Sequence, residues 1–147
     1  MLINHSSDNI IYVVMRKLLQ KKILNHRLIF CISPGRSGSK YLSKLLGTAE
    51  EIKSYLEPKP KMNGRFLEMV TSQSYKNTFE QRKIKSLSIQ NRLIFFNKRK
   101  IYCETNHMFI KTFYDVIIND FKNVEVITLR RNLAFVLKSF IECGYFS

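Results

Sequence analysis

Apolar positions recur along the chain in two patterns, one typical of buried strands and one typical of helices. Residues 28–32 form a continuous apolar run, and residues 124–129 are apolar except for Glu125 and Thr128. The run at 28–32 predicts a strand that is buried on both faces, as in a parallel sheet, and the run at 124–129 predicts a further strand. Shorter runs predict two further strands, at residues 52–56 and 101–103.

Helical spacing fills the segments between these strands. The first helix is predicted from a cap at Asp8 to about Leu24, and its apolar stripe consists of Ile10, Ile11, Val14 and Leu18. We expect this stripe to lie on the domain's own core rather than on a membrane surface. A second helix follows Lys40, carries Tyr41, Leu42, Leu45 and Leu46 at helical spacing, and ends at Gly47 as its C-cap.

The second half of the chain is predicted to contain three more helical segments. Residues 65–96 are helical but interrupted at 71–74, and Thr78 with Gln81 restarts the helix as a capping box. Asn106 and Asn132 each cap a later helix. The first of these turns Phe109, Phe113, Val116 and Ile117 inward, and the last turns Leu133, Val136, Leu137 and Phe140 inward.

This alternation predicts an α/β domain: a parallel sheet with flanking helices and right-handed crossovers. A length of 147 residues, 45% of them hydrophobic, suits one domain spanning 1–147, with residues 1–26 as an N-terminal helical extension. In such sheets, ligands bind beyond the carboxyl ends of the strands. The candidate site is therefore expected in the loops that follow the strands.

The chain carries a net charge of +14, which calls for an anionic partner: nucleic acid, an anionic membrane or a small polyanion. The basic residues crowd into two blocks, one at residues 16–27 and the other at residues 82–100. Three separated cysteines and the lack of any apolar run of about 20 residues favour a cytoplasmic protein without a transmembrane segment.

The turn after the first strand has the composition of an anion site. Gly35 and Gly38 let the backbone approach an anion, and Ser37 and Ser39 offer hydroxyl donors. Arg36 and Lys40 add positive charge. Because a strand, glycines, hydroxyls and cations coincide at one helix start, a phosphate or sulfate site is favoured over an ordinary tight turn.

A magnesium nucleotide fits this turn poorly. Gly38 is followed by Ser39 and Lys40, so the Lys-Ser or Lys-Thr pair of a nucleoside triphosphatase loop is missing. The strand at 124–129 runs into Arg130 and Arg131 instead of ending in an aspartate. We therefore expect no metal, and a P-loop kinase-like enzyme is disfavoured.

Two short motifs resemble those of the P-loop sulfotransferases, which use 3′-phosphoadenosine 5′-phosphosulfate. Residues 36–39 (Arg-Ser-Gly-Ser) match the family's first signature, with Gly35 in place of its proline. Arg131, Asn132 and Ser139 match the spacing of the second signature, with Leu133 in place of a proline. The resemblance implies the three-layer P-loop nucleotide-binding architecture, with the cofactor held by Gly35, Arg36, Ser37, Gly38, Ser39, Lys40, Arg131 and Ser139.

The resemblance also suggests roles in sulfuryl transfer to a hydroxyl or amine. Arg36 would stabilise the leaving oxygen, while Arg131 and Ser139 would meet the 3′-phosphate. The transfer needs a general base, and His107, just after a short strand, is the first candidate. Glu104 and Glu57 are rival bases, and Glu104 is also placed to orient His107.

Two further interpretations stay open. One is a noncatalytic module whose basic surface binds nucleic acid or another polyanion. The other concerns completeness: family members continue well past the second signature, so this chain is either a truncated or a minimal form. A partner chain or an oligomer would then complete the domain, and the acceptor substrate is not specified.

Overall fold

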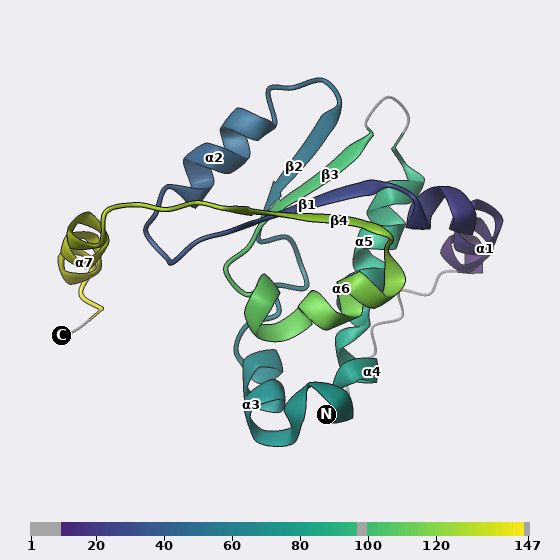
Figure 1. Cartoon of the computed structure of the whole chain (residues 1–147). Helices are drawn as coiled ribbons and strands as arrows, with labels where there is room; N and C mark the ends of the chain where they lie inside the picture. Colours follow the sequence, from purple (N-terminus) through teal and green to yellow (C-terminus); the bar gives the residue numbers. More distant parts are fainter. Residues whose placement is uncertain (1–9, 97–99, 146–147) are drawn as a thin grey trace.

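The computed structural model of the chain describes residues 10–96 and 100–145. Its centre is a parallel four-stranded sheet in the order β2-β3-β1-β4 (Figure 1). The strands are β1 (Arg27–Ile32), β2 (Ile52–Leu56), β3 (Ile101–Thr105) and β4 (Asn123–Thr128). All four lie where the apolar runs predict them, which confirms the α/β class with a parallel sheet and flanking helices.

Eight helical segments connect and flank the strands of the described chain. They are α1 (Ile10–Leu24), α2 (Ser39–Leu46), α3 (Arg65–Asn77), α4 (Phe79–Arg82), α5 (Ile84–Ile94), the π-helix η1 (Phe109–Phe113), α6 (Tyr114–Asp120) and α7 (Leu133–Glu142). The alternation of side chains along the strands gives each face of the sheet its own helices. The two faces consequently have separate cores.

One face packs against α2. Ile29, Cys31 and Cys103 form a small buried cluster there, with Leu42 and Leu46 of α2 against it. The opposite face carries the larger core, in which Leu28, Phe30 and Tyr102 are fully buried. That core is completed by α1, α5, η1 and α6, and the ring of Phe30 stacks on that of Phe109 at 4.1 Å between centroids.

At one point of the sheet, the connections that follow two neighbouring strands lead to opposite faces. The chain leaves β1 into α2 on one face and leaves β3 into η1 and α6 on the other. Because β1 and β3 are neighbours, their carboxyl ends border a crevice at this switch point. The polar loops of the candidate site lie here.

Helix boundaries agree with the predicted caps at several places. Asn132 is the N-cap of α7, and its side chain accepts a hydrogen bond from the Ala134 amide at 2.9 Å. Asn106 accepts a hydrogen bond from the Met108 amide at 2.9 Å, but the N-cap of the π-helix is Met108, so Asn106 is not the cap predicted there. Gly47 is the C-cap of α2, although with a right-handed φ of −71°. The cap predicted at Asp8 lies outside the described residues.

The capping box predicted at Thr78 and Gln81 is wrong. A helix does restart at Thr78, but its hydroxyl donates to the Ser74 carbonyl at 2.7 Å and accepts from Arg82 Nε at 3.0 Å. The interruption predicted at 71–74 is a kink at Ser74, whose φ is 77°, and α3 continues beyond the kink to Asn77. The buried Arg82 guanidinium therefore takes the hydroxyl that a cap would use.

The face predicted to bury α1 is wrong as well. Ile10, Ile11, Val14 and Leu18 are 76%, 58%, 49% and 78% exposed. The helix packs through Tyr12, Met15, Leu19 and Ile23 instead. Apolar residues surround this helix on nearly all sides, so spacing alone does not identify the side that meets the core.

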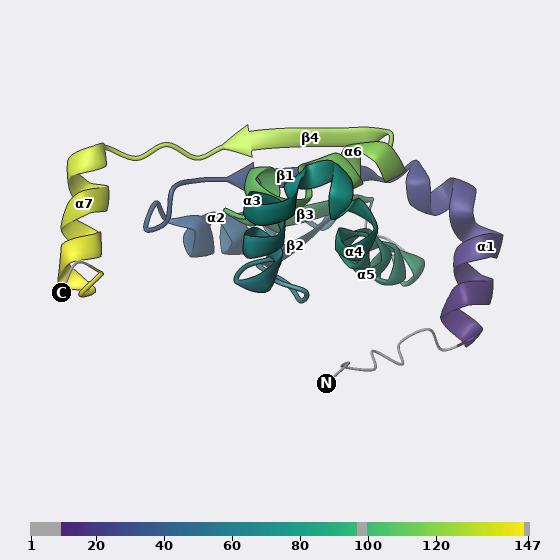
Figure 2. The same ribbon diagram turned by 90° about the horizontal axis from the view of Figure 1, so that it is seen from below.

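The inward face predicted for α7 is only partly found. Val136 is buried, whereas Leu133 and Leu137 are exposed. The helix stands away from the sheet at the end opposite α1, and β4 forms an edge of the sheet (Figures 1 and 2). Phe140 approaches the loop after β1, since a Cβ added to Gly35 would come within 3.1 Å of its ring. The end of α7 is thus joined to the predicted anion loop.

Candidate functional site

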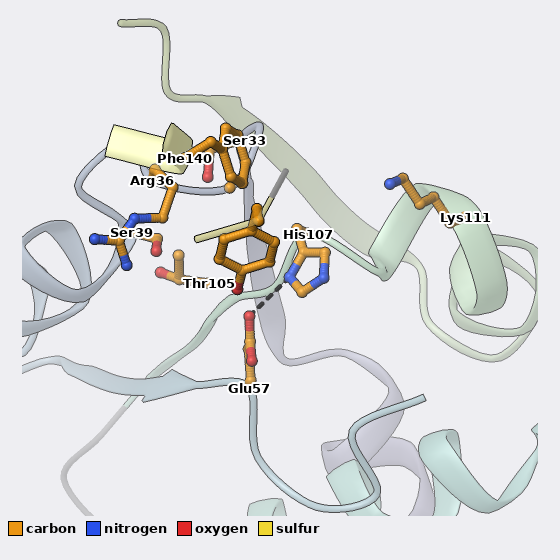
Figure 3. Close-up of a pocket in the computed structure, with 10 residues that line it drawn as sticks. Ser33, Arg36, Ser39, Glu57, Thr105, His107, Lys111 and Phe140 are labelled. Atoms are coloured by element: carbon orange, nitrogen blue, oxygen red, sulfur yellow. Dashed lines mark hydrogen bonds and ion pairs between the residues drawn. The ribbon is translucent and has the colours of Figure 1, made fainter. Parts of the chain in front are cut away.

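A pocket of about 410 Å³ lies at the carboxyl ends of β1, β2 and β3 (Figure 3). Its lining comes from the loop after β1, the ends of β2 and β3, the start of η1 and the end of α7: Ser33, Gly35, Arg36, Ser39, Glu57, Thr105, His107, Lys111, Phe140 and Tyr145. This volume falls within the range of small-molecule sites. The pocket occupies the switch-point crevice, where the sequence predicts the ligand.

The loop after β1 has the backbone that an anion cradle requires. Gly38 is the N-cap of α2 with φ of 92°, and Arg36 also has a positive φ, of 64°. Gly38 has no side-chain cap, so the first amides of α2 are not covered by one. The Ser37 hydroxyl is buried and has no hydrogen-bond partner among the described residues. An anion at this helix start would meet amides, a hydroxyl and positive charge together.

Two of the strained backbone positions lie in the pocket itself. Four residues other than glycine have positive φ in the described ranges, and Arg36 and Glu57 are the two that line the pocket. Such conformations are costly and persist where the surrounding structure holds them. They place the Arg36 and Glu57 side chains on two sides of one cavity (Figure 3).

The two predicted signatures meet through direct hydrogen bonds. Arg36 Nε donates to Ser139 Oγ at 3.0 Å, and Arg131 Nη1 donates to the Arg36 carbonyl at 2.8 Å. The Arg131 guanidinium also lies 5.8 Å from the centroid of the Phe135 ring. The loop after β1 and the segment after β4, about a hundred residues apart in sequence, therefore form one cationic surface.

His107 and Glu57 form the second polar group of the pocket. The His107 Nδ1 lies 2.7 Å from Glu57 Oε1, and the two side chains are 40% and 32% exposed (Figure 3). Since a carboxylate only accepts hydrogen bonds, this contact places the imidazole hydrogen on Nδ1. Nε2 is then the nitrogen that can accept a proton.

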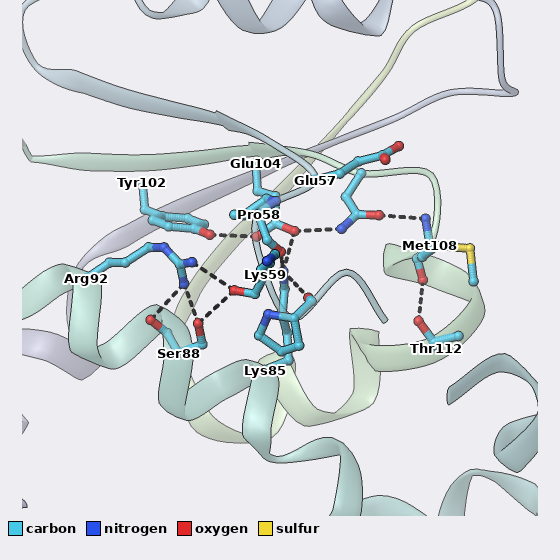
Figure 4. A network of polar contacts seen from close by, with 12 residues as sticks. Glu57, Pro58, Lys59, Lys85, Ser88, Arg92, Tyr102, Glu104, Met108 and Thr112 are labelled. Carbon is cyan, nitrogen blue, oxygen red and sulfur yellow. Dashed lines mark hydrogen bonds and ion pairs between the residues drawn. The ribbon is translucent and has the colours of Figure 1, made fainter. Parts of the chain in front are cut away.

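Glu104 is not part of the pocket lining, and it does not orient His107 as predicted. Its buried carboxylate is 2.7 Å from Lys85 Nζ and accepts hydrogen bonds from Tyr102 at 2.6 Å and Asn106 at 2.7 Å (Figure 4). Strand alternation explains this placement, because Tyr102 and Glu104 point to the face of the large core. Glu57 holds His107 in place of Glu104.

Lys85 is the cation of this buried network. Its ammonium also donates to the carbonyls of Pro58 and Pro60, at 3.0 and 3.1 Å. Burial lowers the pKa of Lys85, and the neighbouring Glu104 charge partly offsets that effect. The same burial raises the pKa of Tyr102, with Glu104 adding to the rise. The network ties the turn after β2, which carries Glu57, to α5 and β3.

The remaining predicted cofactor residues have different positions. Gly35 and Ser39 line the pocket, Gly38 and Ser37 shape the loop, and Lys40 is exposed outside the pocket lining. The sequence interpretation missed Ser33, Thr105, Lys111, Phe140 and Tyr145. For Thr105 a signal existed, since β3 continues two residues beyond the predicted end at Cys103 and brings it to the carboxyl edge.

Thr105 adds a hydroxyl to the floor of the pocket. It is 2% exposed, and its Oγ1 has no nitrogen or oxygen partner in the described part of the chain. The neighbouring buried thiols Cys31 and Cys103 have sulfur atoms 3.7 Å apart. The hydrogen bond between these two thiols lowers the pKa of Cys31 and raises that of Cys103.

Part of the second basic block lies inside the fold and not on a solvated surface. Arg82 and Lys85 are fully buried: Arg82 pairs with Asp115 and Lys85 with Glu104. Arg92 donates to the Lys59 carbonyl at 2.8 Å. Lys98 and Arg99 lie outside the described residues. Much of this block therefore stabilises the fold instead of offering charge to a partner.

Neither a metal centre nor a known relative points to the ligand of this pocket. Among residues 10–96 and 100–145, no three His, Cys, Asp or Glu side chains are grouped as metal ligands. No helix in the same ranges combines the length and apolarity needed to cross a bilayer. Protein-family models, curated proteins and solved structures give no match to the chain. The function is therefore inferred from the geometry of the pocket.

Proposed function

We propose that the protein is a sulfotransferase that binds 3′-phosphoadenosine 5′-phosphosulfate in the pocket at the ends of β1, β2 and β3. The observation that carries the proposal is the contact between the two signatures, Arg36 with Ser139 and Arg131 with the Arg36 carbonyl. A cofactor with a phosphosulfate and a 3′-phosphate needs two neighbouring anion sites. The loop before α2 and the start of α7 provide cations for both.

The same pocket supports the chemistry of transfer. An acceptor hydroxyl or amine attacks the sulfur, the bond from sulfur to the bridging oxygen breaks, and that oxygen keeps the electron pair. Arg36 stabilises the charge that develops there, because fixed cations contribute most where charge appears in the transition state. His107 Nε2 takes the proton of the acceptor, and Glu57 holds the ring through Nδ1. Glu104 has no role in this mechanism.

Calorimetric titration tests the proposal against its alternatives. We expect 3′-phosphoadenosine 5′-phosphate to bind more tightly than ATP with Mg²⁺ and more tightly than a single-stranded oligonucleotide. Strongest binding of ATP with Mg²⁺ would favour a P-loop kinase-like enzyme. Strongest binding of the oligonucleotide, with steep salt dependence, would favour the noncatalytic polyanion-binding module.

A lack of discrimination between nucleotides would overturn the proposal. Adenosine 5′-phosphosulfate lacks the 3′-phosphate and is the matched ligand for this comparison. Equal affinity of the wild-type protein for it and for 3′-phosphoadenosine 5′-phosphosulfate would mean that no 3′-phosphate site exists. Release of sulfate from 3′-phosphoadenosine 5′-phosphosulfate to water gives a readout that does not depend on the acceptor.

A further inference from the structure

Helix α1 presents a ridge of apolar side chains to solvent. Ile10, Val14 and Leu18 follow one another at four-residue spacing and are 76%, 49% and 78% exposed. Residues at this spacing lie on one side of a helix, one above the other. A contiguous apolar ridge of this kind marks an interaction surface more than scattered apolar residues do.

The helix is fixed to the domain, so the ridge cannot turn inward. Arg16 Nη1 donates to Asn91 Oδ1 of α5 at 2.8 Å, and the Tyr12 ring meets the Phe95 ring at 6.1 Å between centroids. Ile23 is buried in the large core. These contacts hold the opposite side of α1 against the domain.

Lysines accompany the ridge along its length. Lys17 lies on one side of it, Lys22 on the other, and Lys21 continues it one turn beyond Leu18. All three are exposed, and α1 contains no acidic residue. The surface therefore combines apolar side chains with unopposed positive charge from its own helix.

This combination distinguishes between possible occupants. A second copy of the chain would bring the same lysines against themselves, and like charges in contact are unfavourable. A nucleic acid would use the lysines but leave the apolar ridge in water. An anionic bilayer accepts both, because apolar side chains enter the boundary of the acyl chains while lysines reach the headgroups.

We propose that α1 docks the protein on the surface of an anionic lipid bilayer. The helix lies in the interface without crossing it, as its 15 residues are too few for a span. The chain runs from α1 through β1 to the pocket, and α1 and α7 lie at opposite ends of the molecule (Figures 1 and 2). Docking through α1 leaves the pocket open to water. The inference is independent of the proposed sulfotransferase activity.

Vesicle flotation with the full chain tests this surface. We expect binding to phosphatidylcholine vesicles containing about 30% phosphatidylserine and at least about tenfold weaker binding to pure phosphatidylcholine, because each surface lysine interacts with anionic lipid. The double variant Ile10→Ser/Leu18→Ser should lose about tenfold or more in affinity for the anionic vesicles. Lys17→Gln/Lys21→Gln should weaken binding to anionic vesicles only.

Matched controls keep the test specific. Ile141→Ser on α7 removes a similarly exposed apolar residue, and Lys44→Gln/Lys53→Gln removes two exposed lysines elsewhere. Both controls should bind vesicles like the wild type, and far-UV circular dichroism should show all variants folded.

Unchanged binding of the α1 variants, or equal binding to both kinds of vesicle, would overturn the proposal. Self-association that disappears in the Ile10→Ser/Leu18→Ser variant, without vesicle binding of the wild type, would overturn it in favour of a dimer.

Discussion

The side chain of Arg36 donates a hydrogen bond through Nε to the hydroxyl of Ser139, 103 residues later in the chain. Arg131 completes the connection from the other side by donating to the Arg36 carbonyl. These two hydrogen bonds therefore hold the loop after β1 against α7 and the segment that precedes it. A change at either position is expected to alter the site as a whole.

Arg131 should discriminate between nucleotides with and without a 3′-phosphate. A charge-assisted hydrogen bond to a phosphate contributes about 1.5–3 kcal/mol, or roughly 10- to 150-fold in affinity. We expect Arg131→Ala to weaken 3′-phosphoadenosine 5′-phosphate by that factor and adenosine 5′-phosphosulfate far less. Ser139→Ala should have a smaller effect in the same direction, because it removes one hydroxyl.

The ratio of the two affinities, measured by calorimetry, is the decisive quantity. General damage to the loop through the lost contact with the Arg36 carbonyl would lower both affinities together. Equal losses for both ligands would therefore make Arg131 a structural residue. Lys138→Ala, which removes an exposed cation from the same helix, is the matched control and should leave the ratio unchanged.

Gly38 should be needed for binding more than for folding. Its φ of 92° is left-handed, and a Cβ there would meet no atom within 4 Å. The cost of Gly38→Val to stability is therefore conformational strain, about 1–2 kcal/mol, and the protein should still fold. Its side chain would occupy the space through which an anion approaches the backbone, so nucleotide binding should be abolished.

Gly47→Ala is the control for this substitution. Gly47 caps the other end of α2 with a right-handed φ, so alanine adds no strain of that kind. Calorimetry should show wild-type nucleotide affinity for Gly47→Ala and no detectable binding for Gly38→Val. Wild-type affinity in Gly38→Val would remove the loop from the site.

The Lys85–Glu104 pair should make stability depend on pH. Burial lowers the pKa of Lys85 below its ordinary 10.5, so the folded chain releases this proton at a lower pH than the unfolded chain does. Between these two pKa values the unfolded chain binds more protons, and the free energy of unfolding rises with pH. Below the folded-state pKa, Lys85 is charged in both the folded and the unfolded chain. The free-energy cost of burying its charge then lowers the stability in full.

Denaturant unfolding followed as the pH is raised toward the ordinary lysine pKa of 10.5 measures this rise. The double variant Lys85→Met/Glu104→Gln removes both charges, so its stability should rise less over the same window. Lys85→Met alone should be the least stable of the three, because it leaves the Glu104 carboxylate buried without its cation. Parallel pH profiles for the wild type and the double variant would contradict the lowered Lys85 pKa.

The sequence predicts those features that are local. Each strand follows from a short apolar run, and Arg36 to Ser39 are identified because an anion loop needs its glycines and hydroxyls within a few residues. The choice between Glu57 and Glu104 as the partner of His107 does not follow from a local pattern. It depends on which face of β3 each side chain meets. Glu104 shares a face with Tyr102, whereas Glu57 follows the end of β2 with φ of 43°.

Tertiary context also decides the side on which α1 packs. Its apolar residues occupy both the ridge of Ile10, Val14 and Leu18 and the packed side with Tyr12 and Ile23, so no period separates them. The contact between Arg36 and Ser139 likewise depends on where α7 stands relative to the loop. The two motifs indicate that the residues belong to one site, but their spacing does not give the hydrogen bonds.

His107 and Glu57 should contribute differently to turnover if the imidazole is the general base. His107→Ala should lower the rate of sulfuryl transfer by about 10²–10⁴ with little change in nucleotide affinity.

Glu57→Gln keeps an oxygen that can accept from Nδ1, whereas Glu57→Ala removes the acceptor. We therefore expect Glu57→Gln to retain more activity than Glu57→Ala. The control is Glu51→Gln, which should match the wild type, because Glu51 lies in an exposed ion pair with Lys100. Steady-state kinetics with sulfate release as readout give these rates. A wild-type rate in His107→Ala together with a large fall in Glu57→Gln would transfer the role of base to Glu57, because turnover would then depend on the carboxylate and not on the imidazole.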